Sequence, residues 1–312
     1  MKILVLGAGA IGGYFGARLV QGGADVQFLV RDRRAAQLRD RGLVVRSPHG
    51  DFTVAAQPLL ATQIDGPADL VLLTCKAYDL DTAITAITPA MGPHSHVLPL
   101  LNGLAHIERL RAAFGAARVA GGSCGIPATL AANGDVVHLS PLHRINFGAL
   151  PGTSADVAPK LDALLKAFSA TPVTAEIADD MLLAMWEKFV GLTTMATMTC
   201  LMRAAVCDIL GTDEGAALMA ETYAACEASA HAAGHTLRAA TMAPFRAMFD
   251  DPRSTMTASM LRDLEAGGRT EGEHIVGDML RRARAAGVEP GPLRAALCHL
   301  QAAELRRRRE HA

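Results

Sequence analysis

The first residues that could do chemistry lie in a glycine-rich turn, GAGAIGG, near the start of the sequence. Gly7, Gly9 and Gly12 have the spacing G-x-G-x-x-G. In such a motif the first glycine allows a tight turn, the second lets a pyrophosphate approach the backbone, and the third lets a helix pack closely on a strand. The free N–H groups of that helix then point at the phosphates. The spacing predicts a phosphate cradle for a dinucleotide; the alternative is a glycine-rich turn without a ligand.

The segments around this turn are those that the motif requires. Met1–Leu6 is a short apolar run, typical of a strand that is buried on both faces. Apolar residues then recur at helical spacing as far as Gly22, and Asp25–Val30 has the composition of a second strand. This strand–turn–helix–strand unit of about 30 residues is the context in which the motif indicates dinucleotide binding.

The residue that follows the second strand indicates which dinucleotide binds. An NAD-binding unit places an acidic side chain there to hold the ribose 2′-OH, whereas Arg31 holds that position in this chain. A guanidinium suits a 2′-phosphate, so we expect NADP. If the register shifted by one residue, Asp32 would hold the ribose and select NAD. Alternatively, the whole charged cluster is only the solvated start of a helix.

Two further polar side chains follow apolar strands. Lys76 comes after the apolar segment Leu70–Cys75, and Asn102 follows the strand predicted over His96–Leu101. Because the carboxyl ends of parallel strands face the cofactor crevice, both are candidates for the site. Asn102 precedes Gly103, however, and Asn-Gly is also a common turn dipeptide.

A lysine and a glutamate in the second half of the sequence are candidates for proton transfer. Lys188 lies in AMWEKFVGL, just before a nearly unbroken apolar stretch, where a lysine often extends to the surface. A partly desolvated ammonium beside a cofactor can instead donate a proton and stabilise an alkoxide. Glu271 follows the Gly267-Gly268 stop at the start of a helix. It either complements the helix dipole or orients Lys188 and holds a ribose.

Other kinds of site have little support in the sequence. His231 and His235 have the i, i+4 spacing of metal ligands, but no carboxylate or cysteine pattern accompanies them, so we expect no metal. The methionines at positions 195, 198 and 202 are typical of a core. The basic block Arg306–Arg309, before Glu310-His311-Ala312, is interpreted as a solvated helix end.

The composition is that of a globular protein with two domains. The chain has 312 residues, half of them hydrophobic and 20% charged, and its net charge of -1 favours no polyanionic partner. Its six cysteines form no C-x-x-C pair, which fits a reducing, cytoplasmic location. No apolar run reaches about 18 residues, and MKILVLGAGA is too short for a signal peptide. We therefore expect neither a nucleic acid nor a membrane as a partner.

The order of the predicted elements indicates an α/β fold followed by helices. Strands and helices alternate in the first half, as in a doubly wound parallel sheet, with a hairpin over Leu43–Val54. Late strands are predicted at Arg118–Ala120, Gly134–Leu139 and Arg144–Gly148. Helices are predicted at Asp179–Leu210, Glu214–Ala233, Met256–Ala266, Thr270–Ala286 and Pro292–Arg308. A capping box, Thr270 with Glu273, is expected to begin the fourth helix.

These patterns predict a Rossmann-type domain over residues 1–178 and an all-helical catalytic or substrate domain over residues 179–312. The site is expected in the cleft between the domains, outside the carboxyl ends of the strands.

Taken together, the motifs resemble those of the ketopantoate reductase (2-dehydropantoate 2-reductase) family over nearly the whole chain. The matching segments, in order, are GAGAIGG, Arg31, CKAYD, LNG, WEKF and SMLRDLEAGGRTE. The resemblance implies an N-terminal Rossmann domain, an all-helical C-terminal domain and NADPH-dependent reduction of a 2-oxo acid.

The resemblance also implies a role for each matching residue. Lys188 would be the general acid and contact the substrate, Ser259 would help to hold the substrate carboxylate, and Glu271 would bind the cofactor ribose and help to position Lys188. Asn102 would position the cofactor and take part in catalysis. The residues implied to contact NADPH are Gly7, Ala8, Gly9, Ala10, Ile11, Gly12, Arg31, Lys76, Asn102, Ala128 and Glu271.

The sequence departs from the family pattern at the positions that contact the substrate. The family usually has asparagines four and eight residues after the catalytic lysine, and this chain has Leu192 and Ala196; Val206 replaces a third. Thr193, Thr194, Thr197 and Arg203 are other candidates for these contacts. An apolar wall cannot select a hydroxyl as an amide does. The substrate is therefore expected to be 2-dehydropantoate or a more apolar 2-oxo acid; a sensor without turnover and a homodimer are further possibilities.

Overall fold

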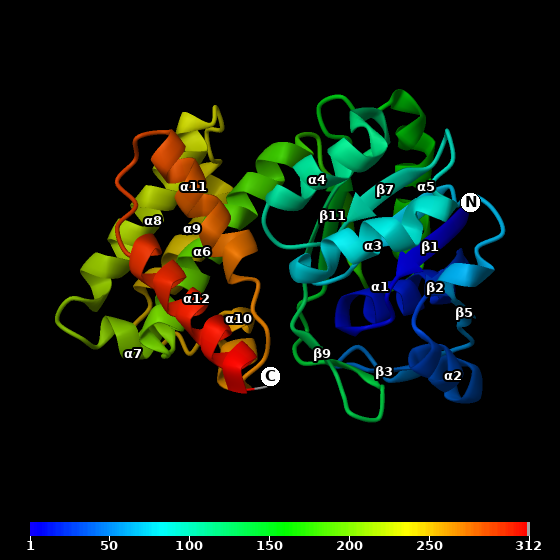
Figure 1. Ribbon diagram of the computed structural model, residues 1–312, viewed down its shortest axis with the longest axis horizontal. Coiled ribbons are helices and arrows are strands. Elements are labelled where there is room, and N and C mark those ends of the chain that lie inside the picture. Colours follow the sequence, from blue (N-terminus) through cyan, green and yellow to red (C-terminus); the bar gives the residue numbers. More distant parts are fainter. Residues whose placement is uncertain (311–312) are drawn as a thin grey trace. The chain divides into compact units, whose positions relative to one another are not determined.

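The computed structural model describes residues 1–310, so the predicted chain end at His311 and Ala312 lies outside the described residues. The chain divides into two compact units. The first comprises residues 1–101 and 106–182, and the second comprises residues 102–105 together with the chain from residue 183 onward. The first is a Rossmann-type α/β unit and the second is all-helical, which confirms the predicted fold class (Figure 1).

A five-stranded parallel sheet forms the centre of the first unit. Its order is β5-β2-β1-β6-β7, and every adjacent pair is parallel. The strands are β1 (Lys2–Leu6), β2 (Asp25–Leu29), β5 (Gln57–Leu59), β6 (Leu70–Leu73) and β7 (His96–Pro99). The central β6 is fully buried and reads as an unbroken apolar run, as expected for a strand that is covered on both faces.

Helices and two smaller sheets complete this unit. The helices are α1 (Ala10–Gln21), α2 (Asp32–Arg41), α3 (Leu80–Ile87), α4 (Ala105–Phe114) and α5 (Ala158–Ser169). One small sheet contains β3 (Leu43–Arg46), β4 (Phe52–Val54), β9 (Ala128–Leu130) and β10 (Val136–His138). The other contains β8 (Gly121–Gly125), β11 (Arg144–Gly148) and β12 (Thr174–Ile177). The predicted hairpin is confirmed by the antiparallel pair β3 and β4.

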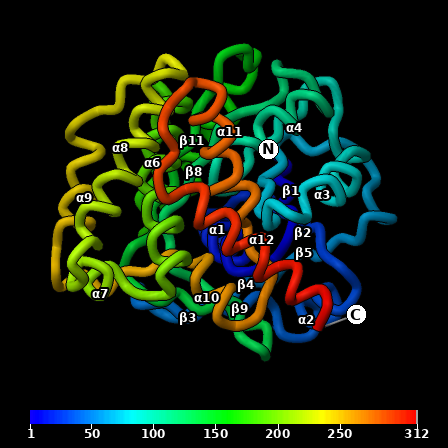
Figure 2. Tube along the Cα trace, turned by 60° about the vertical axis from the view of Figure 1, so that its left-hand side comes forward, coloured from blue at the N-terminus to red at the C-terminus, as the bar shows by residue number. Residues whose placement is uncertain are grey.

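The second unit is built around a long buried helix. Its helices are α6 (Met181–Met202), α7 (Val206–Leu210), α8 (Gly215–Ala232), α9 (Ala239–Asp250), α10 (Ser259–Glu265), α11 (Asp278–Ala285) and α12 (Leu293–Glu310). A π-helical segment, Glu273–Gly277, precedes α11. Figures 1 and 2 show α8, α9, α11 and α12 gathered around α6, which is buried over most of its length. No helix among residues 1–310 is long and apolar enough to cross a membrane.

Three details of the predicted elements were wrong or missed. The helix predicted to continue to Leu210 ends at Met202, because Arg203 adopts a left-handed backbone with φ of 53°. The strand predicted at Arg118–Ala120 is instead β8, a glycine-rich run without strand propensity. Side chains at Gly121 and Gly122 would collide with neighbouring residues, so packing demands glycine there. Helix α9 was missed because Pro244 lies inside it.

The predicted capping box between Thr270 and Glu273 does not form. Glu273 Oε1 accepts a hydrogen bond from Gln301 Nε2 at 2.6 Å, so the carboxylate bonds a neighbouring helix rather than the backbone of Thr270. The turn is closed by the carbonyl of Glu271, which accepts from the N–H groups of His274 and Ile275 at 3.0 Å each. A tertiary contact has therefore replaced the local one.

A histidine cluster joins α1 to the edge of the Rossmann unit. His143 is buried, and its Nδ1 lies 2.6 Å from the hydroxyl of Tyr14. The ring of His49 stacks on the ring of His143 at 3.8 Å, and His138 and Arg18 lie close by. Burial lowers the pKa of His143 to about 4, and the charges of these neighbours lower it in the same direction. His143 is therefore neutral in the folded protein at pH 7.

We expect acid to destabilise the protein through His143. Because its folded pKa lies below the unfolded value of 6.5, the stabilisation is complete above pH 6.5 and is lost as the pH falls toward 4. The loss amounts to about 3 kcal/mol for a shift of this size. Urea unfolding at several pH values should show a shallower dependence for His143→Gln than for the wild type. The exposed-site variant His231→Gln is the control, and equal slopes for His143→Gln and wild type would contradict the assignment.

Candidate functional site

A pocket of about 590 Å³ lies in the Rossmann unit beyond the carboxyl ends of β1 and β2. Residues of the glycine turn form one wall, and the residues that end β2 and begin α2 form another. The lining residues include Gly7, Ala8, Gly9, Val30, Arg31, Arg34, Cys75, Asp79 and Leu130. Among them, Arg31 and Arg34 are basic and Asp79 is acidic. An apolar pocket with basic groups at one end suits an adenine nucleotide.

The backbone of the glycine turn is arranged for an anion. Gly7 has φ of 93°, a conformation that glycine adopts without strain, and its N–H donates to Leu29 O at 2.9 Å. Helix α1 begins at Ala10 with Gly9 as its N-cap, and its first turn contains no acidic residue. Nothing lies within 4 Å of the position that a Cβ of Gly9 would occupy. The positive end of the helix dipole therefore meets open space at Gly9.

The remaining residues of the motif have structural positions. Gly7, Ala8 and Gly9 line the pocket, whereas Ala10, Ile11 and Gly12 do not. A side chain on Gly12 would overlap the carbonyl of Gly7 and the hydroxyl of Thr74. Gly12 is thus required for the approach of α1 to the sheet, as the third glycine of the motif is expected to be.

The two charged residues considered for cofactor choice lie in different positions. Arg31 lines the pocket and is exposed, and its guanidinium has no hydrogen bond or ion pair with any other described residue. Asp32 is the first residue of α2 and does not line the pocket. Only the guanidinium of Arg31 is therefore available at the place where the adenosine ribose of a dinucleotide binds in Rossmann units.

Lys76 and Ala128 border this pocket without lining it. Lys76 is exposed and directly follows Cys75, which does line the pocket. Ala128 begins β9, whose last residue, Leu130, also lines it. Contact of Lys76 or Ala128 with a bound cofactor stays a prediction.

Lys188 lies on α6 next to a buried carboxylate, Glu187, whose ion pair with an exposed arginine was missed by sequence reasoning. Glu187 is fully buried and accepts three hydrogen bonds from Arg238: from the backbone N–H and Nε at 2.8 Å each, and from an Nη at 2.5 Å. Trp186 stacks on His235 with ring centroids 5.3 Å apart. Lys188 itself is half-buried. A carboxylate inside an apolar helical segment was the available signal, because such a charge needs a partner.

Asn102 and Glu271, far apart in sequence, are brought together around His274 in the helical unit. The imidazole of His274 hydrogen-bonds the backbone of Asn102, and Gly103 packs against the same ring. The charge of Glu271 acts on His274, whose pKa is lowered by burial and raised in part by Glu271 and Asp278. His274 lies in the π-helical segment, a local geometry that is frequent at functional sites. The sequence offered no motif that would have identified it.

The candidate substrate-contacting residues on and after α6 lie on different sides of the helix and at different distances from Lys188. Leu192 and Ala196 follow Lys188 by four and eight residues and lie on the same side of the helix. Thr193 and Thr197 are fully buried on the opposite side. Arg203 lies fifteen residues from Lys188, about 22 Å along the helix axis. Ser259 is exposed at the first turn of α10.

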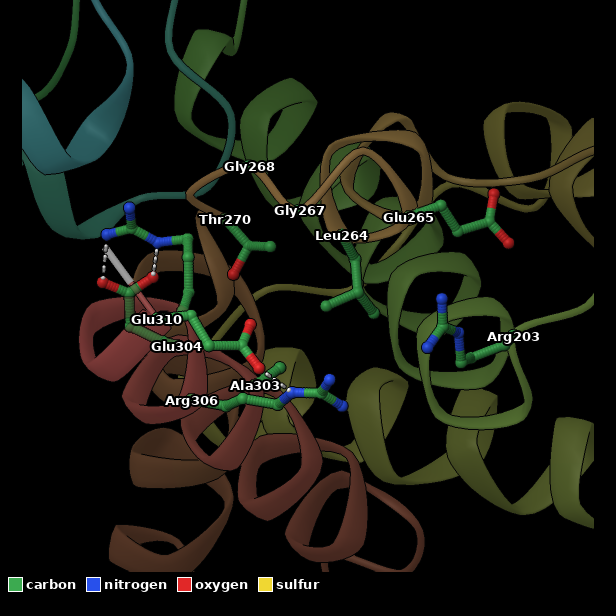
Figure 3. A pocket seen from close by; sticks show the side chains of 11 residues that line it. Arg203, Leu264, Glu265, Gly267, Gly268, Thr270, Ala303, Glu304, Arg306 and Glu310 are labelled. Atoms are coloured by element: carbon green, nitrogen blue, oxygen red, sulfur yellow. Dashed lines mark hydrogen bonds and ion pairs between the residues drawn. The ribbon is translucent and has the colours of Figure 1, made fainter. Parts of the chain in front are cut away.

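Arg203 lines a second pocket, of about 230 Å³, whose charged residues come mainly from α12 (Figure 3). Glu304 accepts from Arg307 at 2.8 and 2.9 Å and from Arg308 at 2.9 Å, which holds its pKa at about 2. Arg306 pairs with Glu310 at 2.7 Å. Three of the four arginines of the basic block thus pair with two carboxylates of their own helix.

The Rossmann unit also contains a hydrogen bond between a serine and a histidine, but its direction is the reverse of the one that activates a serine nucleophile. Ser154 Oγ lies 3.0 Å from Nε2 of His96, while the ammonium of Lys160 donates to Nδ1 of His96 at 2.9 Å. Nδ1 must then be the acceptor, so Nε2 carries the proton and donates to Ser154. His96 cannot accept the proton of Ser154 in this arrangement, which excludes the base of a hydrolase.

The order of the parallel sheet, the glycine turn and the pocket at its carboxyl end define a Rossmann-type class of dinucleotide enzymes with an added helical unit. A family model described as "Ketopantoate reductase PanE/ApbA" matches residues 3–152, and its C-terminal counterpart matches residues 180–303. The chain therefore belongs to the ketopantoate reductase family and is an oxidoreductase of this NAD(P)-dependent family.

Similar proteins extend over almost the whole chain. The uncharacterized oxidoreductase YkpB of Bacillus subtilis is 35% identical over 91% of this chain and 92% of its own length. The structure of 2-dehydropantoate 2-reductase from Geobacter metallireducens is 29% identical, with a TM-score of 0.85 over 97% of this chain and 100% of that one. D-mandelate dehydrogenase, solved with NADH and anilino(oxo)acetate, shares the fold, with a TM-score of 0.85 and 21% identity over 99% of this chain and 100% of that one.

Two alanine substitutions should separate the packing role of the turn from its binding role. Gly12→Ala should reduce the free energy of unfolding by about 2 kcal/mol, because the methyl group overlaps backbone and Thr74. Gly9→Ala should change it by no more than about 0.5 kcal/mol. Gly9→Ala should nevertheless weaken NADPH binding, because the methyl group occupies the open space above the turn. Urea unfolding and fluorescence titration measure these effects. Similar destabilisation by both variants would contradict this division.

Proposed function

We propose that this protein reduces a 2-oxo acid to a 2-hydroxy acid with NADPH. The observation that carries the proposal is the open pocket at the glycine turn, with the unpaired guanidinium of Arg31 in its wall. Gly7, Ala8 and Gly9 would hold the pyrophosphate through backbone N–H groups and the dipole of α1. Arg31 would bind the 2′-phosphate that distinguishes NADPH from NADH.

Proton transfer is assigned to the helical unit. NADPH, when bound, supplies the hydride that adds to the keto carbon of the substrate. Lys188 would donate a proton from Nζ to the keto oxygen, so that the carbonyl becomes a hydroxyl. Its ammonium would also stabilise the negative charge that develops on that oxygen. The resemblance to the family and the half-buried position of Lys188 support this role.

Asn102 and Glu271 would act beside that lysine as positioning groups. The turn at Asn102 is held to the start of the π-helical segment through His274, and the same segment begins after Glu271. This arrangement supports a shared role for both residues in placing the nicotinamide ribose and the amine of Lys188. Ser259, at the exposed first turn of α10, is proposed to contact the substrate carboxylate.

The substrate class follows from the side of α6 that carries Lys188. 2-Dehydropantoate is the first candidate, because relatives across the family are named for it. The second is a 2-oxo acid with a more apolar side chain, because Leu192 and Ala196 offer no hydrogen bond to a substrate hydroxyl. D-mandelate dehydrogenase, a protein with the same fold, is named for an aromatic 2-hydroxy acid, which supports this second candidate.

A substrate panel with matched lysine variants tests the proposal. NADPH oxidation at 340 nm should be seen with 2-dehydropantoate or with an apolar 2-oxo acid, and not without substrate. Lys188→Ala should lower kcat on the best substrate by at least about 100-fold, in keeping with loss of a general acid. Lys166→Ala, in the Rossmann helix α5, is the control and should leave kcat unchanged. Full kcat/KM in Lys188→Ala would remove the lysine from the mechanism.

A further inference from the structure

Arg34, a residue that the motif does not predict, forms hydrogen bonds to the backbone of the glycine turn. Its Nε and one Nη donate to the carbonyl of Ala8 at 3.1 and 2.8 Å. Its other Nη donates at 2.8 Å to both the carbonyl of Gly134 and the side chain of Gln37. Four of the five N–H donors of the guanidinium are thus used within the protein. Arg34 is half-buried, and this burial lowers its pKa.

The hydrogen bonds from Arg34 to the carbonyl of Ala8 determine the direction of the next amide, the N–H of Gly9. The peptide bond between Ala8 and Gly9 is trans, so its carbonyl and its N–H point in opposite directions. Because Arg34 binds the carbonyl on one side, the N–H of Gly9 faces the other. That N–H has no acceptor among residues 1–310, and Gly9 lines the pocket. Arg34 thereby fixes the direction of a free donor at the mouth of the phosphate cradle.

The same guanidinium ties the turn to the loop between β9 and β10. Gly134 lies in that loop, with φ of 87°, and a side chain there would collide with both Arg34 and Gln37. The loop thus closes over Arg34 and keeps it in place. Arg34 and Arg31 both line the pocket. The guanidinium of Arg34 donates to protein carbonyls, whereas the guanidinium of Arg31 has no partner within the described chain.

We propose that Arg34 is a positioning residue for the cofactor pyrophosphate, acting through the backbone of the glycine turn. This inference rests on the proposed NADPH site. Arg34 would support binding of any dinucleotide with a pyrophosphate, whereas Arg31 would select for the 2′-phosphate. Lysine cannot replace Arg34, because a single ammonium cannot span the two carbonyls as the planar fork does.

The test is the binding of three ligands to the full-length chain and its variants, measured by calorimetry. NADPH carries pyrophosphate and 2′-phosphate, NADH only the former, and adenosine 2′-phosphate only the latter. Arg34→Lys should weaken NADPH and NADH by the same factor, about tenfold or more, because a charge-assisted hydrogen bond is lost. It should leave adenosine 2′-phosphate unchanged, which also shows that the site is folded. Arg31→Met should weaken NADPH and adenosine 2′-phosphate and spare NADH.

Arg33→Met is the matched control and should change none of the three affinities, because Arg33 is exposed and does not line the pocket. Selective loss of NADPH in Arg34→Lys would overturn the inference, because it would make Arg34 a direct ligand of the 2′-phosphate. Wild-type affinities in Arg34→Lys would overturn it as well. Arg34→Gln, which removes both the fork and the charge, should also weaken NADPH and NADH by the same factor. A wild-type chain that binds neither NADPH nor NADH would overturn the proposed function together with the inference.

Discussion

The close approach of α1 to the parallel sheet is the contact on which the rest of the Rossmann unit depends. At Gly12 the helix backbone lies so near the carbonyl of Gly7 and the hydroxyl of Thr74 that no side chain fits between them. The Thr74 hydroxyl in turn donates to Leu6 O at 2.7 Å, which joins the ends of β6 and β1. This contact places the start of α1 against the carboxyl ends of the strands. The open backbone at Gly9, where we propose that the pyrophosphate binds, is a consequence of that packing rather than a separate feature.

The two arginines that line the pocket differ in the contacts that their guanidinium groups make. The guanidinium of Arg34 donates its hydrogen bonds to protein carbonyls, including that of Ala8 in the turn. Arg31 precedes α2 as its N-cap residue, and its guanidinium has no partner in the described chain, so its charge is available to a ligand. Two cations three residues apart thus differ in function because only one is within reach of the backbone. The first turn of α1 adds no carboxylate that would oppose an anion.

The helical unit satisfies a buried carboxylate on its central helix with hydrogen bonds from an exposed arginine. Glu187 would be costly to bury alone, but three hydrogen bonds from Arg238 satisfy it and fix the register of α6 beside Lys188. His274 links the turn at Asn102 to the segment that follows Glu271. These contacts bring residues that are distant in sequence close together in the helical unit.

The sequence by itself determined the order of the elements, the class of fold and the phosphate motif, because these follow from local periodicity and from glycine spacing. It did not determine the end of α6 at Arg203, the glycine strand β8 or the bonding of Glu273, since each depends on what packs against the segment. Arg34, Glu187 and His274 were equally hidden. Their partners lie 26, 51 and about 170 residues away along the chain, and only the tertiary structure brings such partners into contact.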